Sequence, residues 1–176
     1  MKVNYLIIIA SVFLFSTISA KADELQTAPY VDIQKYLGKW YEIAAIPQMF
    51  QAGCAGSTAL YELNEDENLS VKNSCFNYYL NREVTASGVG RIVDPETNAK
   101  LKVKFFGPEG DYWILDLASD YSWAIVGEPN RESLWILSRK PQMDSGLYNI
   151  LMERVQNKFG YDVERVKVRY QHAIAP

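Results

Sequence analysis

The side chains that could carry out catalysis or hold a metal are few in this sequence. His172 is the only histidine, which argues against a Ser-His-Asp triad and excludes a multi-histidine metal site. No P-loop is present, and no G-x-G-x-x-G motif opens a helix. Asp111, Asp116 and Asp120 could gather for acid–base catalysis, but aspartates are common in turns and at strand ends. We therefore expect no catalytic residues, no metal and no cofactor.

The two cysteines could form either a reactive thiol or a disulfide. Cys54 and Cys75 flank the polar stretch 64–68, which is typical of a hairpin turn between strands at 57–63 and 69–76. Two cysteines placed on either side of one turn lie opposite each other, or nearly so, on paired strands. No histidine is near them in the sequence to activate a thiol. We predict a Cys54–Cys75 disulfide, which would contribute about 3 kcal/mol on the chain-entropy model.

Residues 1–22 have the pattern of a secretory signal peptide. Lys2 supplies the positive start, residues 5–18 are almost wholly apolar, and Ala20-Lys21-Ala22 is an A-x-A cleavage site. The apolar run is short for a transmembrane anchor, which needs about 20 residues. Because the first cysteine is Cys54, a lipidated N-terminal cysteine is not expected. The sequence predicts an exported mature chain from Asp23, periplasmic in a bacterium and otherwise secreted.

The remaining residues, 23–176, suit one domain. The signal carries two lysines and no acidic residue, so the formal net charge of −3 becomes −5 in the mature chain. A mildly acidic chain argues against a nucleic-acid partner and against strong attraction to an anionic membrane surface. We expect no nucleic-acid partner, and we leave open a peripheral contact with a membrane.

Strand patterns recur along the chain with short turns and no helix between them. Alternating or wholly apolar runs are separated by turn residues such as those at 94–98, 107–111 and 128–131. This order favours an all-β antiparallel meander that closes into an eight-stranded up-and-down β-barrel. The expected strands lie at 40–46, 57–63, 69–79, 82–93, 100–106, 112–117, 121–127 and 133–139.

The period of the apolar residues changes to that of a helix after the eighth strand. In Ser145–Phe159 one face carries Leu147, Ile150, Leu151, Val155 and Phe159. Asp144 or Ser145 can cap its start, and Gly160 suits its end. We expect one C-terminal helix packed on the outside of the barrel, followed by a short strand at 162–170.

Strand parity indicates which side chains face the barrel interior. Lys100, Lys102 and Lys104 must face water, so Leu101, Val103 and Phe105 face inward. Small residues at 86, 88 and 90 favour an internal space over a solid core. An eight-stranded barrel is wide enough either to be filled by side chains or to hold one small ligand, so both interpretations stay open at this point.

Three short motifs, in order and at suitable spacing, resemble the signatures of the lipocalin family. The first is Gly38-x-Trp40-Tyr41-Glu42-Ile43-Ala44, the second is Ser119-Asp120-Tyr121, and the third is Arg139 after Leu134-Trp135-Ile136-Leu137-Ser138. The stretch from Lys102 to Pro108 also resembles bacterial lipocalins of the outer-membrane type, with apolipoprotein D and temperature-induced lipocalin among their relatives. The resemblance runs from about Val31 to Tyr170. Two departures are a serine where the second motif usually has threonine, and the missing lipidation cysteine.

The resemblance implies a calyx that binds a small lipophilic molecule, of the fatty acid or lysophospholipid class, for transport or storage. Trp40 near the start of the strands and Arg139 near their end would meet if the strands close into a barrel, and we predict that they form a structural clamp at the closed end. The alternative is an ordinary core tryptophan and an ordinary surface arginine. Gly38, Asp120 and Tyr121 are further signature residues. Phe50 would lie at the mouth. Combined with strand parity, the resemblance gives as pocket lining Ala59, Tyr61, Val103, Phe105, Tyr112, Ile114, Ala124, Val126, Trp135 and Leu137.

Two other functions compete with a carrier. An enzyme of the same fold would need an inward acid or base, for which Asp116 and Tyr112 are the candidates by parity. A structural protein would have a filled barrel. We expect a binding protein and not an enzyme.

Overall fold

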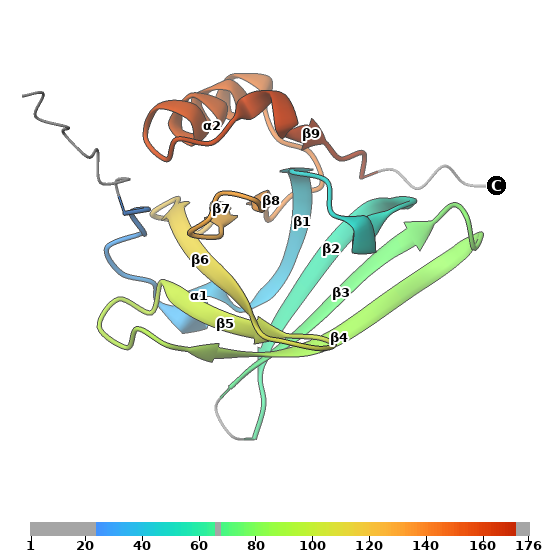
Figure 1. Ribbon diagram of the computed structural model, residues 1–176, viewed down its shortest axis with the longest axis horizontal. Coiled ribbons are helices and arrows are strands. Elements are labelled where there is room, and N and C mark those ends of the chain that lie inside the picture. The colour runs from blue at the N-terminus through green and yellow to red at the C-terminus, as the bar shows by residue number, and fades with distance from the viewer. Residues whose placement is uncertain (1–23, 66–67, 172–176) are drawn as a thin grey trace, which may run out of the picture.

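Nine strands make one antiparallel sheet in the part of the chain that the computed structural model describes, residues 24–65 and 68–171. Neighbouring strands follow the chain from β2 to β8, then β1 and β9. The pairing of β1 with β2 closes the first eight strands into a barrel, so the predicted fold is confirmed (Figure 1). The strands are β1 (Gly38–Ala45), β2 (Cys54–Leu63), β3 (Leu69–Asn77), β4 (Arg82–Ile92), β5 (Lys100–Lys104), β6 (Gly110–Leu117), β7 (Trp123–Gly127), β8 (Leu134–Ser138) and β9 (Lys167–Val168).

Two α-helices and two 3-10 turns complete the secondary structure of those residues. A single helical turn, α1 (Ile33–Tyr36), precedes β1, and α2 (Ser145–Asn157) follows β8. The 3-10 turns are Met49–Gln51, between β1 and β2, and Val163–Arg165, before β9. No helix among these residues is long and apolar enough to cross a membrane. The predicted signal, residues 1–22, and His172 lie outside the described residues.

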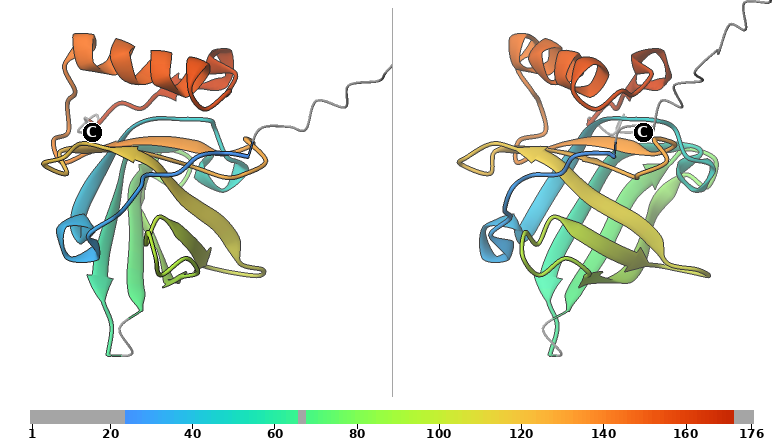
Figure 2. Two further views of the ribbon diagram at one scale, coloured as in Figure 1. Left: turned by 90° about the vertical axis from the view of Figure 1, so that its left-hand side faces the viewer. Right: turned by 60° about the vertical axis from the view of Figure 1, so that its left-hand side comes forward.

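The helix α2 forms as its capping residues predict and lies outside the barrel (Figure 2). The Asp144 side chain accepts a hydrogen bond from the backbone N–H of Leu147, and Gly160 adopts a φ of +69° beyond the last turn. Leu151 and Val155 are fully buried against the sheet. Ile150, predicted to share that face, is half exposed, so the buried stripe is narrower than expected.

Apolar side chains divide into two clusters, one on each side of the barrel wall. The outer cluster packs α2 against the wall and includes Leu115, Ile125, Ile136, Leu151 and Phe159. The inner cluster fills the closed part of the barrel and includes Trp40, Tyr36, Tyr61, Ile114 and Leu137. The wall strands β6, β7 and β8 are therefore buried on both faces, which explains why their sequences are nearly continuous apolar runs.

A β-bulge in β6 overturns one inference from parity. Ile114 pairs with Val126 and Asp116 pairs with Ile125, so Leu115 is an extra residue in the ladder. Leu115 belongs to the outer cluster, and Asp116 faces outward, where its carboxylate lies 2.9 Å from Nη1 of Arg154 on α2. The prediction that Asp116 faces the interior is wrong, because one inserted residue reverses the alternation.

Two predicted strands are shorter than expected because turns occupy their first residues. Tyr121 has a φ of +59° in the turn before β7, and the Asp120 side chain accepts a hydrogen bond from the Ser122 N–H. The segment 162–170 begins with a 3-10 turn, capped by Asp162 through the N–H of Glu164. Only Lys167–Val168 remain as strand β9.

Candidate functional site

The closed end of the barrel is built around the stacking of Arg139 on Trp40. The guanidinium carbon lies 3.7 Å from the centroid of the indole ring. The fully buried indole donates its N–H to the carbonyl oxygen of Tyr36 at 2.9 Å. Gly38 has a φ of +93°, a backbone conformation that glycine adopts readily and residues with a side chain rarely do. This conformation brings α1 and β1 together beneath the ring.

Arg139 holds several segments of backbone together. Its guanidinium donates hydrogen bonds to the carbonyl oxygens of Lys35 at 2.7 Å, Lys39 at 2.9 Å and Tyr121 at 3.3 Å. The Tyr121 hydroxyl in turn accepts the N–H of Asp32 at 2.8 Å. The signature residues thus join α1, β1 and the turn between β6 and β7. We expect the cluster to act as a structural clamp.

A surface cleft of about 370 Å³ borders this clamp on the outside of the barrel. It is lined by Lys35, Ser119, Asp120, Tyr121 and Arg139. Three of these side chains are charged, and Asp120 is exposed. The cleft lacks the apolar lining of a lipid site, whereas the barrel interior on the other side of Trp40 is lined by apolar and aromatic side chains.

A series of aromatic rings leads from the clamp into the barrel. Ring centroids are 5.0 Å apart for Trp40 and Tyr36, 5.5 Å for Tyr36 and Tyr61, and 6.0 Å for Tyr61 and Tyr112. The hydroxyl oxygens of Tyr36 and Tyr112 are 2.7 Å apart, and Tyr61 donates to Tyr112 at 2.8 Å. Burial raises the pKa of all three hydroxyls, so they stay protonated at neutral pH.

Ten of the predicted lining residues belong to the inner cluster or pack against it, but they differ in burial. Tyr61, Ile114, Ala124, Val126 and Leu137 are buried. The others face inward yet remain partly exposed, so the space that they surround is open to solvent. These five are Ala59, Val103, Phe105, Tyr112 and Trp135. The eleventh predicted residue, Phe50, lies in the 3-10 turn between β1 and β2 and is largely exposed.

The small residues of β4 do not supply the internal space that the sequence suggested. A Cβ at Gly88 would lie 2.6 Å from the carbonyl oxygen of Lys104 and 2.8 Å from the Phe105 ring. A Cβ at Gly90 would lie 3.4 Å from Leu69. Close neighbours occupy the positions that side chains at Gly88 and Gly90 would take, so these glycines leave no internal space.

A disulfide ties two strands together at the open end, as predicted. Cys54 at the start of β2 is bonded to Cys75 near the end of β3, with a Cα–Cα distance of 5.4 Å. In the ladder Cys54 lies opposite Asn77, so the two bonded cysteines are diagonal neighbours and not direct partners. Both sulfur atoms are engaged, and neither is available as a nucleophile.

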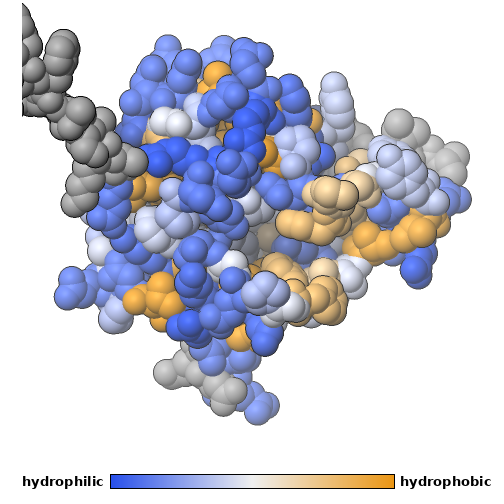
Figure 3. Space-filling view, viewed as in Figure 1, coloured by the Kyte–Doolittle hydropathy of each residue, from blue (hydrophilic) through white to orange (hydrophobic). Residues whose placement is uncertain are grey.

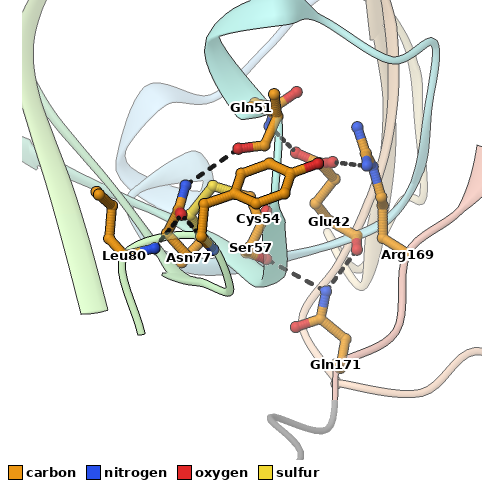
Figure 4. The surroundings of a disulfide bond; sticks show 11 residues. Glu42, Gln51, Cys54, Ser57, Asn77, Leu80, Arg169 and Gln171 are labelled. Carbon is orange, nitrogen blue, oxygen red and sulfur yellow. Dashed lines mark hydrogen bonds and ion pairs between the residues drawn. A yellow bond between two sulfur atoms is a disulfide. The ribbon is translucent and has the colours of Figure 1, made fainter. Parts of the chain in front are cut away.

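Residues 167–171 complete the barrel wall where β1 and β2 separate, a feature that sequence reasoning missed. The Arg169 N–H donates to the carbonyl oxygen of Ile43 on β1 at 2.8 Å. The Gly56 N–H on β2 donates to the carbonyl oxygen of Tyr170 at 2.9 Å. The Gln171 side-chain amide bridges the carbonyl oxygens of Glu42 and Ser57 (Figure 4). The predicted final strand gave no sign of this second set of contacts.

This segment brings Arg169 to a buried carboxylate near the mouth. Glu42 pairs across β1 and β8 with Leu137, an inner-cluster residue, so both side chains share the interior face. Arg169 Nε lies 3.0 Å from Glu42 Oε1, and Gln51 donates to Glu42 Oε2 at 2.7 Å. Burial raises the pKa of Glu42 in spite of these two partners. Among the described residues, no three carboxylate, histidine or cysteine side chains gather closely enough to hold a metal.

Exposed apolar side chains concentrate in the loops around the open end. We call Met49, Phe50, Tyr79, Leu80 and Phe106 the mouth rim. They come from the β1–β2, β3–β4 and β5–β6 connections, and Met49 and Phe106 are 94% and 82% exposed. Figure 3 shows hydrophobic side chains around a hollow in this face of the molecule. Apolar groups of this number at one end indicate a contact surface.

The sequence matches one family model and several known proteins over most of its length. Residues 31–171 match the family model described as a lipocalin-like domain. The chain is 36% identical over 153 residues to temperature-induced lipocalin-1 of Arabidopsis thaliana, covering 81% of each chain. It is 36% identical over 137 residues to the outer membrane lipoprotein Blc of Vibrio cholerae, covering 77% of this chain and 80% of that one. It is 33% identical over 153 residues to apolipoprotein D of Bos taurus, covering 74% and 75%.

A solved structure extends the comparison to the fold. Insecticyanin from the tobacco hornworm Manduca sexta superposes with a TM-score of 0.65 at 20% identity, covering 84% of each chain. The fold therefore agrees with the family that the sequence comparison indicates. The chain belongs to the lipocalin family.

Proposed function

We propose that this lipocalin binds one small lipophilic molecule in the open part of its barrel and carries or stores it. The observation that carries the proposal is the set of inward side chains that remain partly exposed: Ala59, Val103, Phe105, Tyr112 and Trp135. Apolar and aromatic groups that line a space and stay open to solvent gain free energy when a ligand covers them. A filled barrel would have buried them.

A fatty acid or a lysophospholipid is the ligand class that we propose. An acyl chain gains about 0.8 kcal/mol for each CH₂ that it buries, about a fourfold gain in affinity. Its polar head would remain near the mouth, where Glu42 and Arg169 lie. The mouth rim would meet the membrane or lipid particle from which the ligand is taken, because five exposed apolar side chains suit a lipid surface. We also propose that residues 1–22 direct export.

An enzyme of the same fold is the second candidate, and the geometry gives it less support. Asp116, the acid that parity offered to such a site, faces α2 and binds Arg154. The two cysteines are bonded to each other. Tyr112 is the inward candidate that remains, and burial raises its pKa, which weakens it as a base at neutral pH.

Calorimetric titration with saturated fatty acids of increasing length, and with lysophosphatidylcholine, tests the proposal. Affinity should rise with chain length and then level off when the cavity is full. Trp135 fluorescence should change on binding, and the change should disappear in Trp135→Phe. Ala59→Trp should reduce affinity at least tenfold by filling the space, whereas Leu60→Trp, on the outward face of the same strand, should not. Flat titrations with all of these lipids would overturn the carrier function.

A further inference from the structure

The three tyrosine hydroxyls beneath the open space do not satisfy one another completely. Three hydroxyl groups carry three donor protons. Only two hydrogen bonds join them, one between Tyr36 and Tyr112 and one from Tyr61 to Tyr112. One proton is therefore left without an acceptor inside the cluster.

Burial indicates which hydroxyl keeps that proton. Tyr61 already donates to Tyr112. If Tyr112 donated to Tyr36, the Tyr36 proton would point into packed protein, because Tyr36 is 1% exposed and the described residues offer its hydroxyl no second partner. An unsatisfied buried donor is costly. If Tyr36 donates instead, Tyr112 accepts two hydrogen bonds, and its own proton stays on a side chain that packs against the inner cluster without being fully buried.

The surroundings of this donor favour a neutral acceptor over an anion. Its nearest hydrogen-bonding partners are the two other tyrosines, whose pKa values burial raises, so no negative charge develops there in the working pH range. Arg139 lies beyond Trp40 and directs its donors to backbone carbonyl oxygens. A carboxylate placed beside Tyr112 would lose its hydration without gaining a cation.

We propose that the Tyr112 hydroxyl is the innermost polar contact of the pocket and donates a hydrogen bond to a neutral oxygen at the inner end of the ligand. The inference rests on the proposed carrier function and adds to its ligand class long chains that end in a neutral oxygen. Long-chain alcohols, aldehydes and ketones that enter oxygen first satisfy this donor. A chain that enters methyl first leaves it unsatisfied, so fatty acids bound tail-first gain nothing from Tyr112.

The test compares 1-hexadecanol with hexadecane on three proteins: wild type, Tyr112→Phe and Tyr36→Phe. The ratio of the two affinities in each protein removes differences in solubility and packing. Relative to wild type, the ratio should fall about five- to tenfold in Tyr112→Phe, the size expected for one hydrogen bond. It should stay within about twofold in Tyr36→Phe, which removes a hydroxyl but leaves the Tyr112 donor. An unchanged ratio in Tyr112→Phe would overturn the inference.

A second measurement on the wild-type protein keeps the inference testable if Tyr112→Phe does not fold. In a complex with 1-hexadecanol labelled with ¹³C at C1, nuclear Overhauser contacts should connect C1 protons to the Tyr112 ring. Contacts from C1 to Met49 or Phe50 at the mouth rim instead would refute it. Fatty acid binding that persists in either case would leave the carrier function standing, whereas absence of binding by every lipid would remove both proposals.

Discussion

The two ends of the barrel are built in different ways. At the closed end, Trp40 is fully buried, Arg139 stacks on it, and the guanidinium binds carbonyl oxygens of three segments. At the open end, the wall is held by one disulfide and by residues 167–171, and the loops expose apolar side chains. The difference suggests that stability is concentrated where the ligand does not reach, which leaves the mouth free to carry apolar groups that a folded core would bury.

The largest effect that should separate the two ends is the loss of Arg139. Arg139→Leu removes the cation–π contact and several charge-assisted hydrogen bonds, so the free energy of unfolding should fall by roughly 4 kcal/mol. Ligand affinity per folded molecule should stay nearly unchanged, because the Trp40 ring lies between Arg139 and the pocket. Denaturant unfolding and calorimetric titration measure the two quantities, with the exposed neighbour variant Lys140→Leu as control. Lost affinity with unchanged stability would reverse the assignment.

Removing the disulfide should have a smaller effect, confined to the open end. The double substitution of Cys54 and Cys75 by serine should lower the free energy of unfolding by about 3 kcal/mol, because the 21-residue separation is no longer constrained in the unfolded chain. Amide hydrogen exchange should become faster near Cys54 and Asn77 and remain slow near Tyr61 and Val71. Equal acceleration along the whole length of β2 and β3 would show that the two ends are not independent.

The smallest effect concerns the pH dependence of the buried Glu42. Its pKa is raised above 4.5 by burial, so the folded state holds its proton more tightly than the unfolded state. Stability from this group is therefore fully present below about pH 4.5 and is lost as pH rises through the folded pKa. The unfolding free energy of the wild type should decline over this window, and Glu42→Gln should remove the decline. Asp94, Glu109 and Asp120 have lowered pKa values and act in the opposite direction at lower pH.

If the unfolding free energy of Glu42→Gln declines with rising pH as that of the wild type does, the pH dependence comes from another group. Arg169→Gln is a useful companion variant, because loss of the cation should raise the pKa of Glu42 further and steepen the decline. Both variants alter the mouth alone, so neither should reproduce the loss caused by Arg139→Leu.

The sequence predicted the barrel, the outer helix and the disulfide because each depends on local periodicity or on one short turn. It also brought Trp40 and Arg139 together, because closing the strands into a barrel sets the first strand beside the last. Parity failed at Asp116, since a single inserted residue at Leu115 reverses the faces and leaves no mark in the hydrophobic pattern. Parity alone also could not separate buried inward residues, such as Ala124, from partly exposed ones, such as Ala59.

The contacts at the mouth were beyond prediction for a different reason. Arg169 and Glu42 are 127 residues apart in numbering and meet only because β1 and β2 separate near Ile43 and Gly56. The gap depends on strand curvature, which a pattern of polar and apolar residues does not encode. Likewise, the small size of Gly88 predicted free space inside the barrel, but the Phe105 ring lies where a side chain of residue 88 would be.

The C-terminal contribution to the wall imposes an order on biosynthesis. A chain made from its N-terminus has all of β1–β8 before it has residues 167–171. Until then, the carbonyl oxygen of Ile43 and the N–H of Gly56 lack the partners that they have in the folded protein. The barrel therefore has a seam beside its mouth that residues 169–170 close. We expect that a chain shortened to end at Val168 folds its closed end yet retains no lipid.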